Sequence, residues 1–170
     1  MNLRVKIKRV KDVELPKYAK PGDAGFDLVA AEDVVIKPGE TKVIPTGLAF
    51  EIPPGYEMQI RPRSGMSRKT KLRVVLGTID SGYRGEVGVI ADNASLIEYA
   101  SQPRFATGIL VGDNDFNITK PIKYETILIN KGDRIAQGVI APVLKAHFIE
   151  VDELSESDRG TGGFGSTGVK

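Results

Sequence analysis

The sequence contains no cysteine, no tryptophan and only one histidine, His147. Without cysteine the chain has no disulfide, no thiolate nucleophile and no cysteine-ligated zinc site. A single histidine is too little for a metal site, so we interpret His147 as structural. No segment approaches the ~20 consecutive apolar residues of a membrane helix, and the amino terminus lacks the apolar core of a signal peptide.

The formal net charge is only +2. The overall field of the protein therefore favours neither nucleic acid nor an anionic membrane as a partner, and we expect neither. The basic runs near the amino terminus and after residue 66 are better explained as solvated faces. The absence of cysteine fits an intracellular protein, and we expect a cytoplasmic location.

The 170 residues are 41% hydrophobic, enough for one domain with a real core. Short β-branched runs, separated by glycine and proline, predict strands. A short helix fits only 62–72. We therefore expect an all-β jelly roll, sandwich or barrel. On pattern alone, a plain β-sandwich that binds a ligand through its loops remains an alternative. The predicted strand regions are Leu3–Val10, Asp33–Gly65, Lys71–Ala91 (two strands joined by a hairpin turn) and Glu125–Leu144.

Five turns carry residues that a purely structural turn does not need. The second combines a guanidinium, a hydroxyl and main-chain N–H groups, a set suited to phosphate oxygens. The last is rich in glycine yet includes an arginine and an aromatic ring. The five are "AGFDL" (24–28), "PRSGMS" (62–67), "GTIDSGYRGEV" (77–87), "GDRIAQGVI" (132–140) and "RGTGGFGSTG" (159–168).

Each of these residues also has a structural interpretation. Asp27 can cap a turn, and Arg63 and Ser64 can cap the helix that follows them. Asp80 can be a hairpin-turn aspartate, and Gln137 can be an exposed residue of a sheet. Only their combination, in this order along the chain, favours a functional site.

In that order, the five stretches resemble the five motifs of the trimeric, all-β deoxyuridine triphosphatases (dUTPases), particularly members from Gram-positive bacteria or their phages. The resemblance implies a distorted jelly-roll or β-barrel domain over 1–158, with one short helix after the second motif. A flexible glycine-rich arm, 159–170, would close an active site. It further implies hydrolysis of dUTP to dUMP and pyrophosphate with Mg²⁺, by homotrimers with shared sites. This activity keeps uracil out of DNA and supplies dUMP for dTTP synthesis.

The resemblance also implies the role of each residue. Asp80 would orient and deprotonate the attacking water and read the sugar 3′-hydroxyl. Tyr83 would pack on the deoxyribose and leave no room for a 2′-hydroxyl. Main-chain groups at Gly77, Thr78, Ile79, Asp80 and Gly88 would pair with the uracil edge.

The phosphates would be held by Arg63, Ser64 and Gly65, and Gln137 would support the phosphate and water network. Asp27 would reach Mg²⁺ through water, because Mg²⁺ usually keeps waters and takes substrate phosphates as ligands. From the arm, Arg159 would neutralise phosphate charge and Phe164 would stack on the uracil. Gly165 and Ser166 would wrap the phosphates.

Two features depart from the family pattern. Val74 stands where members often carry an asparagine that helps read the base. The extra loop, about 91–130, is far longer than usual and resembles that of some phage dUTPases from Gram-positive bacteria. An accessory hairpin on the outside of the domain is one interpretation of this insert, and a binding site for a regulatory protein is the other.

A dCTP deaminase is the alternative enzyme, because such deaminases share the fold and some motifs. They carry a general-base glutamate on the strand after the third motif. The matching position here is Ile90, which we expect to be buried and which has no proton to transfer. A dUTPase that also works as a regulatory binding protein is the remaining alternative.

Overall fold

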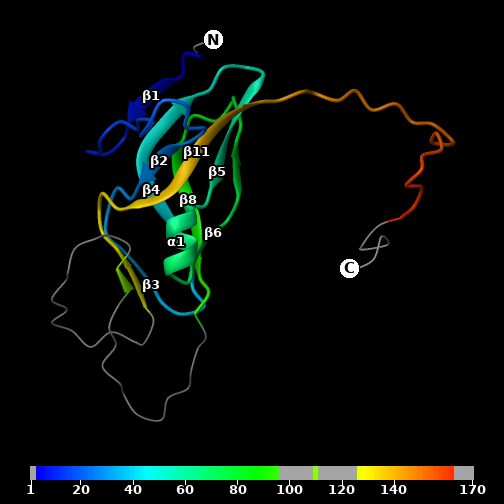
Figure 1. The fold of residues 1–170 in the computed structure, drawn as a ribbon. Coiled ribbons are helices and arrows are strands. Elements are labelled where there is room, and N and C mark those ends of the chain that lie inside the picture. Colours follow the sequence, from blue (N-terminus) through cyan, green and yellow to red (C-terminus); the bar gives the residue numbers. More distant parts are fainter. Residues whose placement is uncertain (1–2, 96–108, 111–125, 163–170) are drawn as a thin grey trace.

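The computed structural model describes residues 3–95, 109–110 and 126–162 as a layered β structure with one short helix (Figure 1). One four-stranded sheet has the order β1 (Lys6–Arg9), β4 (Thr41–Glu51), β8 (Glu86–Asn93), β6 (Leu72–Val74). The second has the order β2 (Phe26–Val29), β11 (Arg134–Pro142), β5 (Tyr56–Arg61), β7 (Gly77–Ile79). A three-stranded sheet has the order β3 (Val34–Ile36), β10 (Ile127–Ile129), β9 (Ile109–Leu110), with β9 and β10 parallel.

The strands form because apolar and polar residues alternate along them. In β2 the side chains of Phe26 and Leu28 are buried while those of Asp27 and Val29 are only half-buried, the pattern of a strand with one face on the core. The inward faces of the sheets share one core, whose largest fully buried side chains include Leu28, Ile36, Ile44, Leu48, Ile52, Met58, Leu72 and Ile135. The predicted all-β fold is confirmed.

The predicted helix in 62–72 is present as α1 (Ser64–Lys69). Met66 is its buried residue and attaches the helix to the core. The helix ends at Thr70, whose hydroxyl donates to the Met66 carbonyl oxygen at 2.9 Å. The helix follows β5 directly, and this places the start of α1 at the end of the second sheet.

The hairpin predicted in Lys71–Ala91 is wrong. This segment contains three strands, and β7 and β8 belong to different sheets. The Val75 N–H donates to the Ile90 carbonyl at 2.9 Å and prolongs the β6–β8 ladder. The chain then crosses to the other sheet, where Gly77 pairs with Ile60 of β5. Residues 80–85 are therefore a connection between sheets, which the alternating sequence alone does not distinguish from a hairpin turn.

The expected loop, about 91–130, begins and ends in strands. Ala91 and Asn93 are buried residues of β8, and Ile127 and Ile129 are buried residues of β10. Within this range, 96–108 and 111–125 lie outside the described residues. The interpretations of the insert, as accessory hairpin or as protein-binding site, fall mainly on those residues and stay predictions.

After β11 the chain leaves the sheets as a long extended arm, coloured orange to red in Figure 1. From here on the arm means the whole segment after Pro142, which is described to residue 162 and so is longer than the expected arm of 159–170. The Val143 N–H still donates to the Gly55 carbonyl at 2.8 Å, but the apolar side chains beyond it contact little. The exposed fractions are 97% for Leu144, 91% for Phe148 and 88% for Leu154. Across the described part of the chain, no helix is long and apolar enough to cross a membrane.

Candidate active site

Three polar residues form a row across the second sheet. Asp27 of β2 pairs in register with Gln137 of β11, and Gln137 pairs with Arg61 of β5. Directly opposed residues of antiparallel strands project from the same face. Since Phe26 and Leu28 face the core, this row lies on the outer face of the sheet. Gln137 is therefore on a strand, as predicted, beside the first-motif aspartate.

Asp27 is held between two arginines. Its Oδ1 lies 2.8 Å from Arg63 Nε, and its Oδ2 lies 3.5 Å from Arg134 Nη1. The Asp27 side chain is only 21% exposed, yet Oδ1 receives no hydrogen bond of normal geometry, so the contact with Arg63 is an ion pair. Arg63 Nη1 also donates to the Arg134 carbonyl oxygen at 3.2 Å. The first, second and fourth motifs thus meet at one carboxylate.

The second motif lies where β5 passes into α1. Arg63 stands at the N-cap in an extended conformation, with φ −89° and ψ 129°, and its side chain makes no capping hydrogen bond. The structural alternative, that Arg63 caps the helix, is therefore wrong. Ser64 and Gly65 are exposed, and a Cβ added to Gly65 would meet no atom within 4 Å. The hydroxyl and main chain of the motif face open space.

The third motif supplies Asp80 and Tyr83 on the turn between β7 and β8. Asp80 is exposed, and its carbonyl accepts a hydrogen bond from the Tyr83 N–H at 3.0 Å. Tyr83 is 45% exposed, and its hydroxyl donates to the Glu86 carbonyl at 3.0 Å. The tyrosine ring therefore folds back over the end of the turn and leaves one side accessible.

Within one chain, Asp80 and Arg63 lie at opposite ends of the β5–β7 ladder. Gly77 pairs with Ile60, and Ile79 pairs with Met58, so Asp80 continues away from the end at which β5 leads to Arg63. Asp80 is level with Glu57 of β5, which is six residues before Arg63. Six residues of extended chain at ~3.3 Å each span roughly 20 Å. A single chain therefore does not bring Asp80, the predicted catalytic carboxylate, to its own Arg63.

The predicted base-reading segments lie on two sheets. Gly77, Thr78 and Ile79 make up β7, whereas Gly88 lies on β8 opposite Pro45 of β4. The two strands are in contact although they are not hydrogen-bonded neighbours.

Val74 and Ile90, the two positions that distinguish this chain from family patterns, both lie on the first sheet. Val74 is half-buried on β6, where it pairs with Ala91. Ile90, expected to be buried, is 43% exposed. The reason is that β8 alternates, with Val89 and Ala91 facing inward. An exposed isoleucine is still no proton carrier, so the argument against deamination holds.

The described part of the fifth motif, 159–162, does not lie beside the other motifs. Arg159 lies in the extended arm, where its Nε donates to the Gly162 carbonyl at 2.9 Å, and Figure 1 places this part far from α1. His147 lies in the same arm and is exposed. Phe164, Gly165 and Ser166 fall outside the described residues, so their roles stay predictions.

Sequence reasoning missed two arginines, Arg134 and Arg84. Arg134 pairs with Asp27 and lies in the fourth motif, three residues before Gln137. Arg84 lies directly after Tyr83 and contacts the turn that carries it. Their only sequence signal is position inside a motif, because the partners of both come from geometry that spacing does not reveal.

The model of the dUTPase family matches residues 11–125 and 116–168, and so covers nearly the whole chain. The chain belongs to the dUTPase family. The predicted family and enzyme class, the hydrolysis of dUTP, are confirmed. Two curated deoxyuridine 5′-triphosphate nucleotidohydrolases illustrate the similarity. That of Nautilia profundicola is 47% identical, covering 98% of this chain and 99% of its own. That of Clostridium acetobutylicum is 46% identical, covering 99% of both chains.

Solved structures of phage dUTPases agree with this assignment. The Staphylococcus bacteriophage 80alpha dUTPase with dUPNHPP is 34% identical and has a TM-score of 0.88, covering 99% of this chain and 100% of the phage chain. The phage phi11 dUTPase from S. aureus, solved to visualise a species-specific insert, is 32% identical with a TM-score of 0.82. It covers 91% of this chain and 100% of its own. A mutant of the phi11 dUTPase coordinates a structural Mg(II) ion. The predicted resemblance to phage dUTPases is confirmed.

Proposed function

We propose that this dUTPase cleaves dUTP by attack of water on the α-phosphorus, releasing pyrophosphate and dUMP, at sites shared between the subunits of a homotrimer. The observation that carries the proposal is a match over nearly the whole chain to a dUTPase solved with dUPNHPP. A cytoplasmic location stays a prediction.

Asp80 is the proposed general base. Its carboxylate is exposed at the end of β7, where it can orient a water and accept its proton. A carboxylate is only a moderate base, so alignment and charge neutralisation supply most of the rate enhancement. This requires that the turn carrying Asp80 keeps a fixed shape.

Tyr83 and the neighbouring main chain are the proposed selectivity elements. The ring of Tyr83 packs on the deoxyribose and excludes a 2′-hydroxyl, and main-chain groups of Gly77, Thr78, Ile79 and Gly88 pair with the uracil edge. Backbone pairing of this kind needs no asparagine at Val74. A pocket built this way discriminates by leaving no space for the wrong substituent.

Arg63, Ser64 and Gly65 are the proposed phosphate-binding group, with Gln137 supporting the phosphate and water network. The ion pair with Asp27 fixes the Arg63 guanidinium, so little side-chain entropy is lost when phosphate arrives. Planar guanidinium groups suit phosphate oxygens because they donate two parallel hydrogen bonds.

The residues present fit Mg²⁺ bound mainly by the substrate. Among the described residues no group of three or more His, Cys, Asp or Glu is placed to hold a metal ion. Both carboxylate oxygens of Asp27 face arginines, which favours contact with the ion through water over direct ligation. Bound with the phosphates, Mg²⁺ would neutralise charge on them.

Two features support sites shared between subunits. Asp80 and Arg63 lie beyond opposite ends of the β5–β7 ladder within one chain. The arm that carries Arg159 extends from the sheets with bare apolar side chains, and burying these against another subunit removes apolar surface from water. Arg159 would then neutralise phosphate charge, Phe164 would stack on uracil, and Gly165 and Ser166 would wrap the phosphates.

The first test is product analysis with Mg²⁺ on dUTP, dTTP, dCTP and UTP, with Asp80→Asn as the inactive control. We expect dUMP and pyrophosphate from dUTP alone, and at least a ~100-fold lower rate for the variant, as for loss of a general base. Release of ammonia from dCTP would establish the deaminase alternative. No turnover by a folded wild-type protein would refute the hydrolase.

The second test mixes inactive chains. After subunit exchange between Asp80→Asn and a chain lacking 159–170, about one quarter of the sites in random trimers combine an intact Asp80 with an intact arm from another subunit. The same holds for Asp80→Asn mixed with Arg63→Ala. Activity near that fraction supports shared sites, and no recovery after verified exchange contradicts them.

A further inference from the structure

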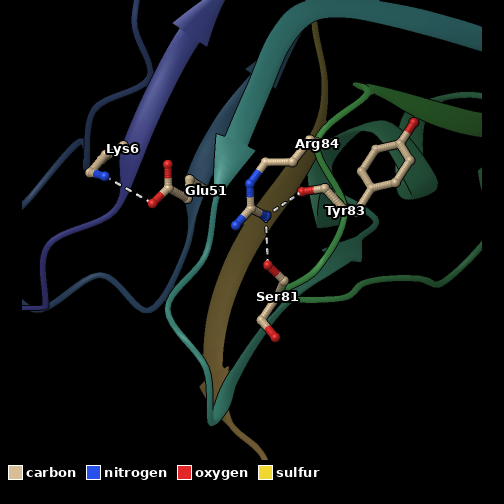
Figure 2. Close-up of polar contacts among 5 residues, drawn as sticks. All are labelled: Lys6, Glu51, Ser81, Tyr83 and Arg84. Atoms are coloured by element: carbon tan, nitrogen blue, oxygen red, sulfur yellow. Dashed lines mark hydrogen bonds and ion pairs between the residues drawn. The ribbon is translucent and has the colours of Figure 1, made fainter.

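The guanidinium of Arg84 closes the turn that carries Asp80 and Tyr83. A single nitrogen, Nη1, donates to the Ser81 carbonyl oxygen at 2.6 Å and to the Tyr83 carbonyl oxygen at 2.8 Å (Figure 2). Hydrogen bonds from a charged donor are stronger than those between neutral groups. Two carbonyls on either side of Gly82 are thereby fixed relative to each other.

These two hydrogen bonds matter for the conformation of the turn, because few other contacts fix it. Apart from the contacts of Arg84, the described chain fixes it by the Tyr83 N–H bond to the Asp80 carbonyl and by the Tyr83 hydroxyl bond to Glu86. Gly82 and Gly85 both lie in this segment and have the widest backbone freedom of any residue. Without the arginine, the turn has more accessible conformations than the one observed.

A carboxylate on the neighbouring sheet favours this position of the guanidinium. Figure 2 shows Glu51, at the end of β4, on the side of Arg84 away from the turn. Glu51 Oε1 accepts a hydrogen bond from Lys6 Nζ of β1 at 2.9 Å. The pKa of Glu51 is lowered first by this bond and, more weakly, by the charge of Arg84. The carboxylate therefore stays ionised and attracts the guanidinium from the sheet side.

We propose that Arg84 is a positioning residue of the dUTPase reaction: by bonding two carbonyls of the turn, it holds the Asp80 carboxylate and the Tyr83 ring where the substrate meets them. In this role Arg84 acts through the turn and not on the substrate, because both of its recorded hydrogen bonds run from Nη1 to main-chain carbonyls of the turn. The inference rests on the function proposed above for Asp80 and Tyr83.

The test compares Arg84→Ala with the wild type on dUTP and UTP. If the observed turn conformation falls to about one tenth of the population, kcat for dUTP falls about tenfold, while KM changes less. The preference for dUTP over UTP falls as well, because the same bonds position Tyr83. Amide exchange of residues 80–84 in the substrate-free protein accelerates. Arg84→Lys, which keeps the charge but not the planar fork, gives an intermediate result.

Arg9→Ala is the matched control. Arg9 is an exposed residue of β1 for which the described chain records no side-chain hydrogen bond or ion pair, so its loss changes the net charge equally without touching the turn. We expect wild-type kinetics from it. If Arg84→Ala does not fold, Arg84→Gln, whose amide retains one donor group, replaces it in the same comparison.

Three results overturn the inference. One is unchanged kcat, unchanged dUTP preference and unchanged amide exchange in Arg84→Ala. Another is a rise in KM alone that grows with the number of phosphates, which identifies a direct phosphate contact. The third is an equal effect of Arg9→Ala. Failure of the proposed function is distinguishable, because the wild type itself would then not hydrolyse dUTP.

Discussion

Replacing Gly85 by alanine displaces the Tyr83 ring without disturbing the backbone. A Cβ added at Gly85 would lie 2.7 Å from Tyr83 Cζ and 3.1 Å from Cε2, whereas carbon atoms in contact are normally about 3.5–4.0 Å apart. Gly85 is not among the glycines with positive φ, so alanine fits its backbone. The tyrosine is half exposed and rotates away, by about 1 Å at the ring.

The expected cost in stability is small because two effects offset each other. Rotation breaks the Tyr83 hydroxyl bond to Glu86, which contributes about 0.5–1.5 kcal/mol. Alanine in place of glycine restricts the unfolded chain and returns about 0.4–1 kcal/mol. The free energy of unfolding of Gly85→Ala should therefore lie within about 1 kcal/mol of the wild type.

The effect on substrate choice is larger. Fit of a small group in a pocket is worth about 1–3 kcal/mol, or 10–200-fold in kcat/KM. With the ring displaced, we expect the kcat/KM ratio of dUTP to UTP to fall at least about tenfold, measured by pyrophosphate release from each nucleotide. Gly82→Ala is the matched control, because a Cβ there meets nothing within 4 Å and should leave the ratio unchanged. An unchanged ratio in Gly85→Ala would refute the assigned role of Tyr83.

Two further predictions concern stability. In Gly138→Ala, the new Cβ would lie 2.7 Å from ring carbons of Phe26 and 3.2 Å from Met58 Sδ. This overpacking should lower the free energy of unfolding by about 1–3 kcal/mol, measured by urea unfolding at fixed protein concentration. Stability equal to the wild type would contradict this packing. Lys6 lowers the pKa of Glu51, so their pair adds stability above the unfolded-state pKa of about 4.3 and loses it as the pH falls through the lowered value. Glu51→Gln should flatten the stability profile in that acidic window and nowhere else, as followed by thermal unfolding from pH 3 to 7; an identical profile would show that the pair contributes nothing.

The sequence predicted the elements of the fold well but not all of their pairings. Alternation and turn residues located the short helix α1 and every strand except β2 and β9, because both signals are local. The supposed hairpin around Asp80 failed, since pairing partners depend on contacts distant in the sequence: β7 joins β5, not β8. Ile90 was wrongly expected to be buried. One face of β8 is exposed, and the alternation of the strand puts Ile90 on that face.

In the candidate site, too, the sequence predicted residues inside motifs but not the contacts between distant parts of the chain. Motif order identified Asp27, Arg63 and Gln137, which the structure brings together at one end of the second sheet. It did not identify Arg134 or Arg84, whose partners are a carboxylate on another strand and main-chain carbonyls of a turn. Main-chain acceptors are present at every residue, so no pattern in the side chains marks the ones that an arginine will bind.

Motif order also cannot say which motifs of one chain serve the same site. Antiparallel pairing of β5 with β7 sends the second and third motifs to opposite ends of one ladder, and the arm leads its described residues, 159–162 of the fifth motif, away from both. The proposed chemistry requires all of them around one triphosphate. Under that proposal, groups that the fold separates within a chain come together where copies of the chain meet. The proposed trimer would therefore complete a site that the isolated subunit leaves incomplete.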